Sequence, residues 1–239
     1  MNVRDKINND GYLVIPKVFT KNEINEFKTE ITQYTKTKFK NIHGKSIIDP
    51  INKHPLISIS KILNNTIIND TLLNIFQTPN YRFCQHNDIS IDRVVGWHKD
   101  KLNGIYSKYQ TRDIWTTYQN EKHEILKVLI YLQDHKEKQD GLRIIPKSHH
   151  DRKITKDNSI HIDIEAGDIL IFDQRITHRG PKKIGKKCRT LISLGYGKNN
   201  IFTDQFESGT QQRQKDKKYF DCQICSVKRR KKCLCKNKK

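Results

Sequence analysis

Residues 167–173 read GDILIFD, a Gly-Asp turn followed by an apolar run rich in β-branched side chains. This pattern is typical of a tight turn that leads into a buried β-strand. Similar short apolar runs lie elsewhere in the second half of the chain, separated by turn residues, at 89–91, 94–95, 127–132, 142–145, 161–164 and 189–196. The sequence therefore predicts many short strands between residue 80 and residue 200.

The first third of the chain has a different pattern. Residues 11–16 (GYLVIP) predict one short strand, and residues 20–23 (TKNE) form a capping box that opens a helix. Ile24, Phe27 and Ile31 share one face of that helix, and apolar residues recur at helical spacing between 55 and 76. We expect a mainly β fold, a sandwich or jelly roll, with helices packed on one face.

Composition excludes several classes of protein. The 239 residues are 34% hydrophobic and 30% charged, which suits one core of ordinary size and not a disordered chain. No apolar run approaches the ~20 residues of a membrane helix, and the polar first ten residues lack the apolar region of a secretory signal. The cysteine pattern does not resemble a disulfide framework, so we expect an intracellular protein, in the cytoplasm or the nucleus.

The formal charge of +20 is unevenly distributed. Residues 211–239 hold twelve Lys or Arg and two Asp, so we place a boundary near Gln211. Residues 1–210 are the expected folded domain, with a helical flank at about 20–78 and a jelly roll at about 80–200. The tail, residues 211–239, is expected to be flexible or a small zinc-binding element. Its four thiolates could make a tetrahedral zinc site, and its basic run also suits nucleic-acid contact; these cysteines are Cys222, Cys225, Cys233 and Cys235.

His-x-Asp triplets provide the first chemical signal. A non-haem iron site needs two neutral imidazoles and one carboxylate on one side of the metal. A His-x-Asp triplet on a strand places both side chains on the same face. Four such triplets occur, at 86/88, 98/100, 149/151 and 161/163, so the triplet alone is not diagnostic.

His178 is the candidate for the second imidazole, because it lies near the end of the strand that follows Gly167. We expect it to reach the site from the sheet that faces the triplet. His98 and Asp100 precede it by enough chain for several strands and a covering segment. His86 and Asp88 have similar room and stay the competing pair, whereas the 149/151 triplet falls in a polar loop and the 161/163 triplet is close to His178 in the chain.

These segments resemble the phytanoyl-CoA dioxygenase-like family of Fe(II)/2-oxoglutarate-dependent oxygenases. The resemblance covers roughly residues 8–200 and rests on 10–16 (DGYLVIP), 96–100 (GWHKD), 126–132 (LKVLIYL), 141–149 (GLRIIPKSH) and 167–172 (GDILIF), followed by His178 and Arg189. The family's usual Pro-Gly-Ser-His is here Pro146-Lys147-Ser148-His149, so a glycine turn is replaced. The resemblance implies a double-stranded β-helix, which is a cupin-like jelly roll.

The same resemblance implies that His98, Asp100 and His178 bind iron(II), and that 2-oxoglutarate is converted to succinate and CO2 while a substrate is hydroxylated. Retention of Asp100 favours hydroxylation, since related halogenases have a small residue there. Arg189 is the expected partner of the distal carboxylate of 2-oxoglutarate, because a guanidinium pairs with a carboxylate in bidentate fashion and is costly to bury alone. Ser193 lies on the same strand face and is a further candidate contact.

Other interpretations stay open. Each of these residues could be structural when taken singly, and the other histidines are read as ordinary polar positions. Trp115 and Tyr118, in the polar segment 101–124, could stack on a substrate or anchor that segment. The basic charge suits an acidic substrate, which the sequence does not identify. The alternative function is a catalytically inactive jelly roll that binds nucleic acid through its basic, cysteine-rich tail.

Overall fold

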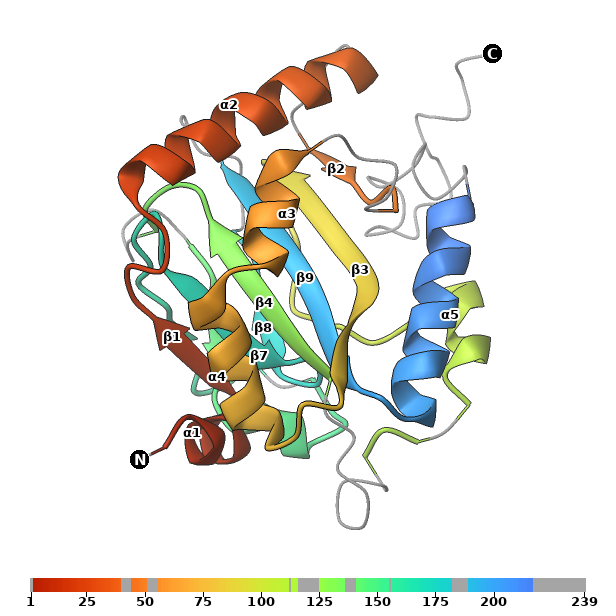
Figure 1. The fold of residues 1–239 in the computed structure, drawn as a ribbon. Helices are drawn as coiled ribbons and strands as arrows, with labels where there is room; N and C mark the ends of the chain where they lie inside the picture. The colour runs from red at the N-terminus through yellow and green to blue at the C-terminus, as the bar shows by residue number, and fades with distance from the viewer. Residues whose placement is uncertain are drawn as a thin grey trace.

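Two antiparallel β-sheets form the framework of the computed structural model, which describes residues 2–39, 44–50, 56–111, 113–115, 125–135, 141–154, 156–181 and 189–216 (Figure 1). The larger sheet has the strand order β1-β7-β4-β9-β3-β2, and the smaller sheet has the order β6-β5-β8. The strands are β1 (Tyr12–Ile15), β2 (Lys45–Ile47), β3 (Tyr81–Ile91), β4 (Ile125–Tyr131), β5 (Arg143–Ile145), β6 (Ile160–His161), β7 (Ile169–Asp173), β8 (Thr177–Arg179) and β9 (Thr190–Lys198).

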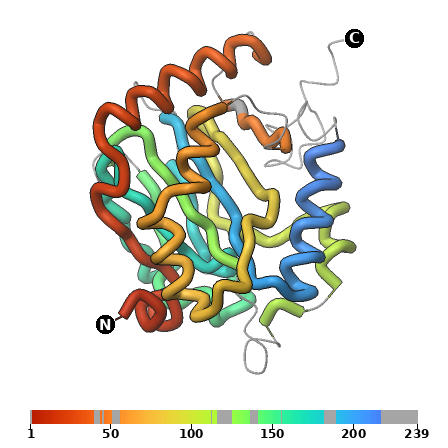
Figure 2. The backbone as a smooth tube through the Cα atoms, in the orientation of Figure 1, coloured from red at the N-terminus to blue at the C-terminus, as the bar shows by residue number. Residues whose placement is uncertain are grey.

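Helices cover the outer face of the larger sheet. In Figure 1, α2, α3 and α4 lie across this face, while α1 lies near the N-terminus and α5 beside β3. The backbone trace in Figure 2 shows that α5 and β1 lie at opposite sides of the molecule. The helices are α1 (Val3–Asp10), α2 (Lys21–Lys38), α3 (Ile57–Leu63), α4 (Thr66–Phe76) and α5 (Ile201–Lys215), with short 3₁₀ turns at Gly104–Tyr109 and Ser148–His150.

Strand β4 shows why the larger sheet has a helical side and a cavity side. Every residue of β4 is buried, so both faces of this central strand are covered. Leu126, Val128 and Ile130 pack in the cluster formed with the helices, whereas Leu129 and Tyr131 pack in the cluster formed with the smaller sheet. Alternate residues therefore reach opposite sides of the sheet, as a strand's period of two requires.

The predicted elements of the N-terminal third are present. Residues Tyr12–Ile15 form β1, which pairs with β7 in antiparallel register. Thr20 caps α2: its side chain accepts from the backbone N–H of Glu23, and the Glu23 side chain accepts from the backbone N–H of Thr20, so the predicted capping box is confirmed. The mainly β fold with helices on one face is confirmed as well.

Three features differ from the expectations. Helix α1 has no strong apolar pattern and was not predicted. His178 does not lie at the end of the strand that follows Gly167; a turn after Asp173 ends β7, and His178 is the middle residue of the separate strand β8. Helix α5 crosses the expected boundary near Gln211 and stays packed beyond it, since Gln214 is buried and donates to the carbonyl oxygen of Gln85 at 2.8 Å.

Several predictions fall outside the described residues. The four tail cysteines, Cys222, Cys225, Cys233 and Cys235, lie there, as does Tyr118. Zinc binding and nucleic-acid contact by the tail stay predictions. Within the described ranges, none of the helices combines the length and the apolar character that crossing a bilayer demands.

Candidate metal and co-substrate site

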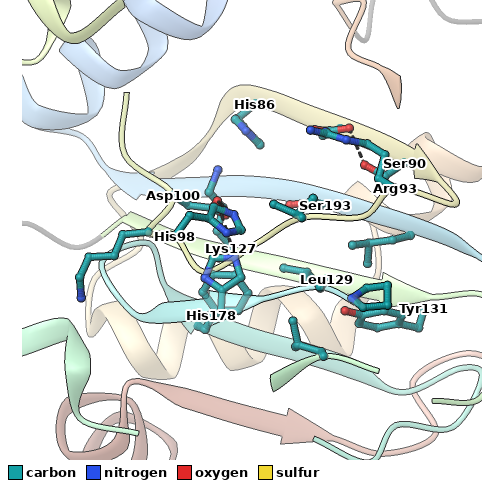
Figure 3. A pocket seen from close by; sticks show the side chains of 18 of the residues that line it. His86, Ser90, Arg93, His98, Asp100, Lys127, Leu129, Tyr131, His178 and Ser193 are labelled. Carbon is teal, nitrogen blue, oxygen red and sulfur yellow. Dashed lines mark hydrogen bonds and ion pairs between the residues drawn. The ribbon is translucent and has the colours of Figure 1, made fainter. Parts of the chain in front are cut away.

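A cavity of about 260 Å³ lies between the two sheets. Its walls come from the inner faces of β3, β4 and β9, from the segment that contains His98, and from β8 and α5. Figure 3 shows side chains from these elements pointing toward a common space. Segments far apart in the sequence therefore contribute to one site.

His98, Asp100 and His178 converge at one end of this cavity (Figure 3). One potential ligand atom from each residue lies within 4.8 Å of the other two. Nε2 of His98 is 3.2 Å from Oδ1 of Asp100, and Nε2 of His178 is 3.7 Å from the same oxygen. Among the described residues this is the one group of three His, Cys, Asp or Glu residues that could hold a metal ion.

Backbone pairing brings the three residues together. His98 and His178 form an antiparallel bridge, in which each backbone N–H donates to the other's carbonyl oxygen at 2.9 and 3.0 Å. The backbone N–H of Asp100 donates to the carbonyl oxygen of Gln174 at 2.8 Å. His178 thus lies on strand β8, which is bridged directly to the segment of His98, and the expectation that it comes from the facing sheet was wrong.

Hydrogen bonds orient both imidazole rings. Nδ1 of His98 lies 2.8 Å from the carbonyl oxygen of Gly96, and Nδ1 of His178 lies 3.1 Å from that of Ile176. A carbonyl oxygen only accepts, so each Nδ1 carries the proton and each Nε2 has a free lone pair. This is the usual arrangement of metal-binding histidines.

Lys99 holds the His-x-Asp segment in place, a role that sequence analysis missed. Its side chain is buried. The ammonium donates to the carbonyl oxygens of Ser148 and Arg175 at 2.6 and 2.7 Å. Burial, the largest cause, lowers the pKa of Lys99 to about 8. The segment is therefore tied to the turn that precedes β8.

The electrostatics of the three residues suit cation binding. Burial opposes ionisation of Asp100, but the neighbouring imidazoles of His178 and His98 outweigh it and hold the pKa of Asp100 well below its usual range. Burial and the neighbouring His98 lower the pKa of His178 to about 4. Burial also opposes protonation of His98, yet the neighbouring carboxylate of Asp100 raises its pKa. A carboxylate and a neutral imidazole are thus available at neutral pH.

The competing pair, His86 and Asp88, does not form a metal site with the other candidates. His86 and Asp88 both line the cavity, but neither joins the group that could hold a metal. Asp88 accepts from Ser90 at 2.9 Å and from Arg93 at 3.2 Å. His86 is buried.

The other two triplets lie away from the cluster. His149 is buried, and its Nε2 donates to the carbonyl oxygen of Asn8 at 3.1 Å, so it is not solvated. His161 lies 3.1 Å from its own triplet partner, Asp163, whose side chain is 62% exposed. At the position where the family has a glycine turn, Lys147 adopts the left-handed conformation with φ 65°, so the turn itself is retained.

Arg189 and Ser193 line the same cavity. The backbone N–H of Arg189 donates to Asp92 at 2.7 Å, which fixes the residue at the start of β9. Burial and the charge of Arg189 lower the pKa of His135 to about 4, so the guanidinium influences this imidazole electrostatically. Ser193 is at the middle of the sheet, in register with Leu129 on β4. Trp115 contacts Lys101 and is not among the residues that line the cavity.

A comparison with protein-family models decides the family. The model described as Phytanoyl-CoA dioxygenase (PhyH) matches residues 7–191. The chain belongs to the phytanoyl-CoA dioxygenase family. A search of curated proteins returned no match.

Several solved structures have a similar fold. HygX from Streptomyces hygroscopicus with nickel and 2-oxoglutarate bound has a TM-score of 0.63 and 16% identity, covering 82% of this chain and 87% of that chain. The non-heme alpha ketoglutarate dependent carbocyclase SnoK from nogalamycin biosynthesis has a TM-score of 0.60 and 17% identity, with coverages of 82% and 83%. The epimerase SnoN from the same biosynthesis has a TM-score of 0.58 and 13% identity, with coverages of 81% and 80%.

This phytanoyl-CoA dioxygenase family member therefore has the jelly-roll fold expected from its sequence and is a 2-oxoglutarate-dependent oxygenase. The family match covers residues 7–191, which contain His98, Asp100, His178 and Arg189. Fold and family do not by themselves assign a substrate or a role to each residue.

Proposed function

We propose that the protein is an Fe(II)- and 2-oxoglutarate-dependent hydroxylase in which His98, Asp100 and His178 hold the iron. One observation carries this proposal: two imidazole nitrogens and a carboxylate oxygen, distant in sequence, lie within 4.8 Å of one another at the wall of a cavity. Two histidines and one carboxylate on one side of a metal are the donor set of non-haem iron oxygenases. When bound, iron and 2-oxoglutarate supply the oxidant, with succinate and CO2 as co-products.

The chain's own residues prepare this donor set. The Nε2 atoms of His98 and His178 keep their lone pairs because each Nδ1 donates to a carbonyl oxygen. Asp100 is held ionised by its two histidine neighbours. Lys99 holds the segment in place, so the three ligand atoms are preorganised before a metal binds.

Arg189, assisted by Ser193, binds the distal carboxylate of 2-oxoglutarate in this proposal. Both residues line the cavity that contains the metal ligands. A planar guanidinium offers two parallel N–H donors to a carboxylate, which both orients the co-substrate and neutralises its charge.

The primary substrate is proposed to be acidic. Cationic side chains outnumber the acidic ones, Asp88 and Asp100, around the cavity; they are Arg93, Lys99, Lys101, Lys127, Arg189 and Arg213. Such a surplus of positive charge in a partly buried cavity favours an anionic ligand.

The test uses the full-length protein with His98→Ala, His178→Ala and, as a matched control, Asp163→Asn. Asp163 belongs to another His-x-Asp triplet and is exposed, so its substitution should leave the site intact. Ni(II) binding is measured by calorimetry, and succinate formation is measured with Fe(II) and 2-oxoglutarate in the absence of a primary substrate. Changes outside the ligand set of metal sites cost roughly 10–100-fold in affinity, so loss of a ligand should cost about 100-fold or more.

We expect both histidine variants to lose metal affinity and succinate formation, while Asp163→Asn keeps them. Wild-type metal affinity in both histidine variants would refute the ligand assignment. Arg189→Gln should retain the metal but bind 2-oxoglutarate at least about tenfold more weakly, since a charge-assisted bidentate pair is worth more than 1.4 kcal/mol. An unchanged affinity for 2-oxoglutarate would exclude Arg189 as its partner.

A further inference from the structure

Lys127 is a buried lysine that faces the cavity from the centre of the larger sheet (Figure 3). It lies on β4 with none of its surface exposed. Its Nζ atom has no hydrogen-bond partner in the part of the chain that the structure describes. An ammonium group in such surroundings is costly unless an acceptor is supplied, because burial removes its hydration.

The groups around Lys127 form what we call the Lys127 subsite, which consists of Lys127, His86, Phe206 and Arg213, all lining the cavity. The ammonium lies 4.9 Å from the centre of the Phe206 ring, and that ring lies 5.7 Å from the imidazole of His86. His86 is 7% exposed, and its Nδ1 also has no hydrogen-bond partner within the described ranges. Two buried polar groups thus face one space with unused hydrogen-bonding capacity.

The charge of the subsite is positive. Burial is the main cause that lowers the pKa of His86, and the charges of Lys127 and Arg213 lower it further. Among the negative groups, Asp100 has the largest effect on the pKa of Lys127, but the ammonium has no hydrogen-bond partner among the described residues. The carboxylate of Asp100 is already held by His98 and His178.

The subsite and Arg189 lie at opposite ends of the cavity. Lys127 is in register with Gly195 on β9, whereas Arg189 precedes Gly195 by six residues. Six residues of strand span about 20 Å. The neighbours of the two residues also differ. The charge of Arg189 acts to lower the pKa values of Tyr131 and His135, whereas the charge of Lys127 acts to lower the pKa of His86.

We propose that the Lys127 subsite binds an oxyanion of the primary substrate, a carboxylate or a phosphate monoester, and so selects an acidic substrate. Lys127 donates to this oxyanion, Arg213 adds positive charge, and Phe206 provides an apolar wall beside it. The identification of the bound molecule as a substrate rests on the proposed function, because Asp100, a proposed metal ligand, lines the same cavity as Lys127 and shifts its pKa. Lys127 is a specificity-determining residue in this proposal and takes no part in the oxidation.

The experiment measures the binding of inorganic phosphate and of acetate to the full-length protein by calorimetry. Each probe is titrated into protein loaded with Ni(II) and saturating 2-oxoglutarate, and into protein kept metal-free with a chelator. Lys127→Met removes the ammonium and keeps a similar length of side chain, with Lys127→Gln as a second variant if Lys127→Met does not fold. Lys153→Met is the matched control, since Lys153 is an exposed lysine outside the cavity.

We expect at least one probe to bind the wild type and Lys153→Met equally, and to bind Lys127→Met at least tenfold more weakly. The affinity for 2-oxoglutarate should change less than twofold in Lys127→Met. Equal probe binding by the wild type and Lys127→Met, or no binding of either probe to the wild type, would overturn the proposal. A large loss of 2-oxoglutarate affinity in Lys127→Met would also overturn it, because Lys127 would then serve the co-substrate.

The metal-free titration separates this inference from the proposed function. If the wild type bound neither Ni(II) nor 2-oxoglutarate, the proposed function would fail, whereas a Lys127-dependent affinity for phosphate would still establish an oxyanion site. If metal and 2-oxoglutarate bound normally and the probes did not distinguish Lys127→Met from the wild type, the oxyanion site alone would fail.

Discussion

Replacement of Lys127 by methionine should make the ligand-free protein more stable. Burial is the main cause that lowers the pKa of Lys127 from 10.5 to about 8. At about 1.4 kcal/mol for each pH unit, this difference corresponds to about 3 kcal/mol of destabilisation of the folded state at neutral pH. Methionine has no charge to bury, so Lys127→Met should recover about this amount.

The gain should depend on pH with a definite sign. Below pH 8 the lysine is charged in both the folded and the unfolded state, so the folded wild type bears the full cost. Between pH 8 and 10.5 the folded state loses its proton before the unfolded state does, so the wild type becomes relatively more stable. The advantage of Lys127→Met should therefore shrink across this range.

Urea unfolding of metal-free protein, followed by circular dichroism at about pH 7 and about pH 9.5, measures both effects. A gain of about 3 kcal/mol corresponds to a rise in Tm of roughly 6–12 °C for a chain of this size. Lys153→Met, which removes an exposed charge, should stay within about 0.5 kcal/mol of the wild type. If Lys127→Met were less stable than the wild type at neutral pH, the claim that Lys127 is a buried charge without a hydrogen-bond partner among the described residues would be wrong.

Three further predictions concern stability. Asp173→Asn should destabilise the fold by about 3–5 kcal/mol at neutral pH in urea unfolding, because Asp173 forms a buried ion pair with Arg175; a change below about 1 kcal/mol would contradict this. Burial, the main cause, lowers the pKa of His149 to about 4. The free energy of unfolding of the wild type should therefore fall by about 2 kcal/mol relative to that of His149→Gln as the pH drops from 6.5 to about 5. Equal pH dependence of stability in the two proteins would argue against a buried neutral imidazole. Thr20→Ala should cost about 1 kcal/mol in thermal unfolding through loss of the capping box with Glu23, and an unchanged Tm would show that the cap contributes nothing.

Local sequence patterns were sufficient where the deciding contacts are local. The capping box at Thr20 and the apolar run at 169–172 each involve neighbours in the chain, and both elements appear as expected. The break between β7 and β8 was not visible, because Arg175 reads as an exposed turn residue although it is among the most deeply buried side chains. The end of the folded part was misjudged from charge, since α5 keeps an apolar face at Phe202 and Phe206 while its other face is polar.

The candidate site could be narrowed from the sequence but not resolved. Four His-x-Asp triplets have the same local pattern, and the bridge between His98 and His178 distinguishes one of them. That bridge is a contact between segments 80 residues apart, so spacing along the chain carries little information about it. Lys99, which ties the segment to the turn before β8, reads as a surface lysine between two ligand candidates until its carbonyl partners are known.

Lys127 violates the pattern that otherwise specifies β4, and this violation links stability to function. An apolar residue at this position would complete a strand that is buried on both faces. The lysine instead places an ammonium 4.9 Å from the centre of the Phe206 ring, where the described residues offer it no hydrogen-bond acceptor. Residues that break local rules without a structural compensation are expected at functional sites, because a ligand provides the missing interaction. Lys127→Met should therefore be more stable than the wild type and bind oxyanions more weakly. If the role of Lys127 were purely structural, Lys127→Met would be less stable and its oxyanion affinity would not change.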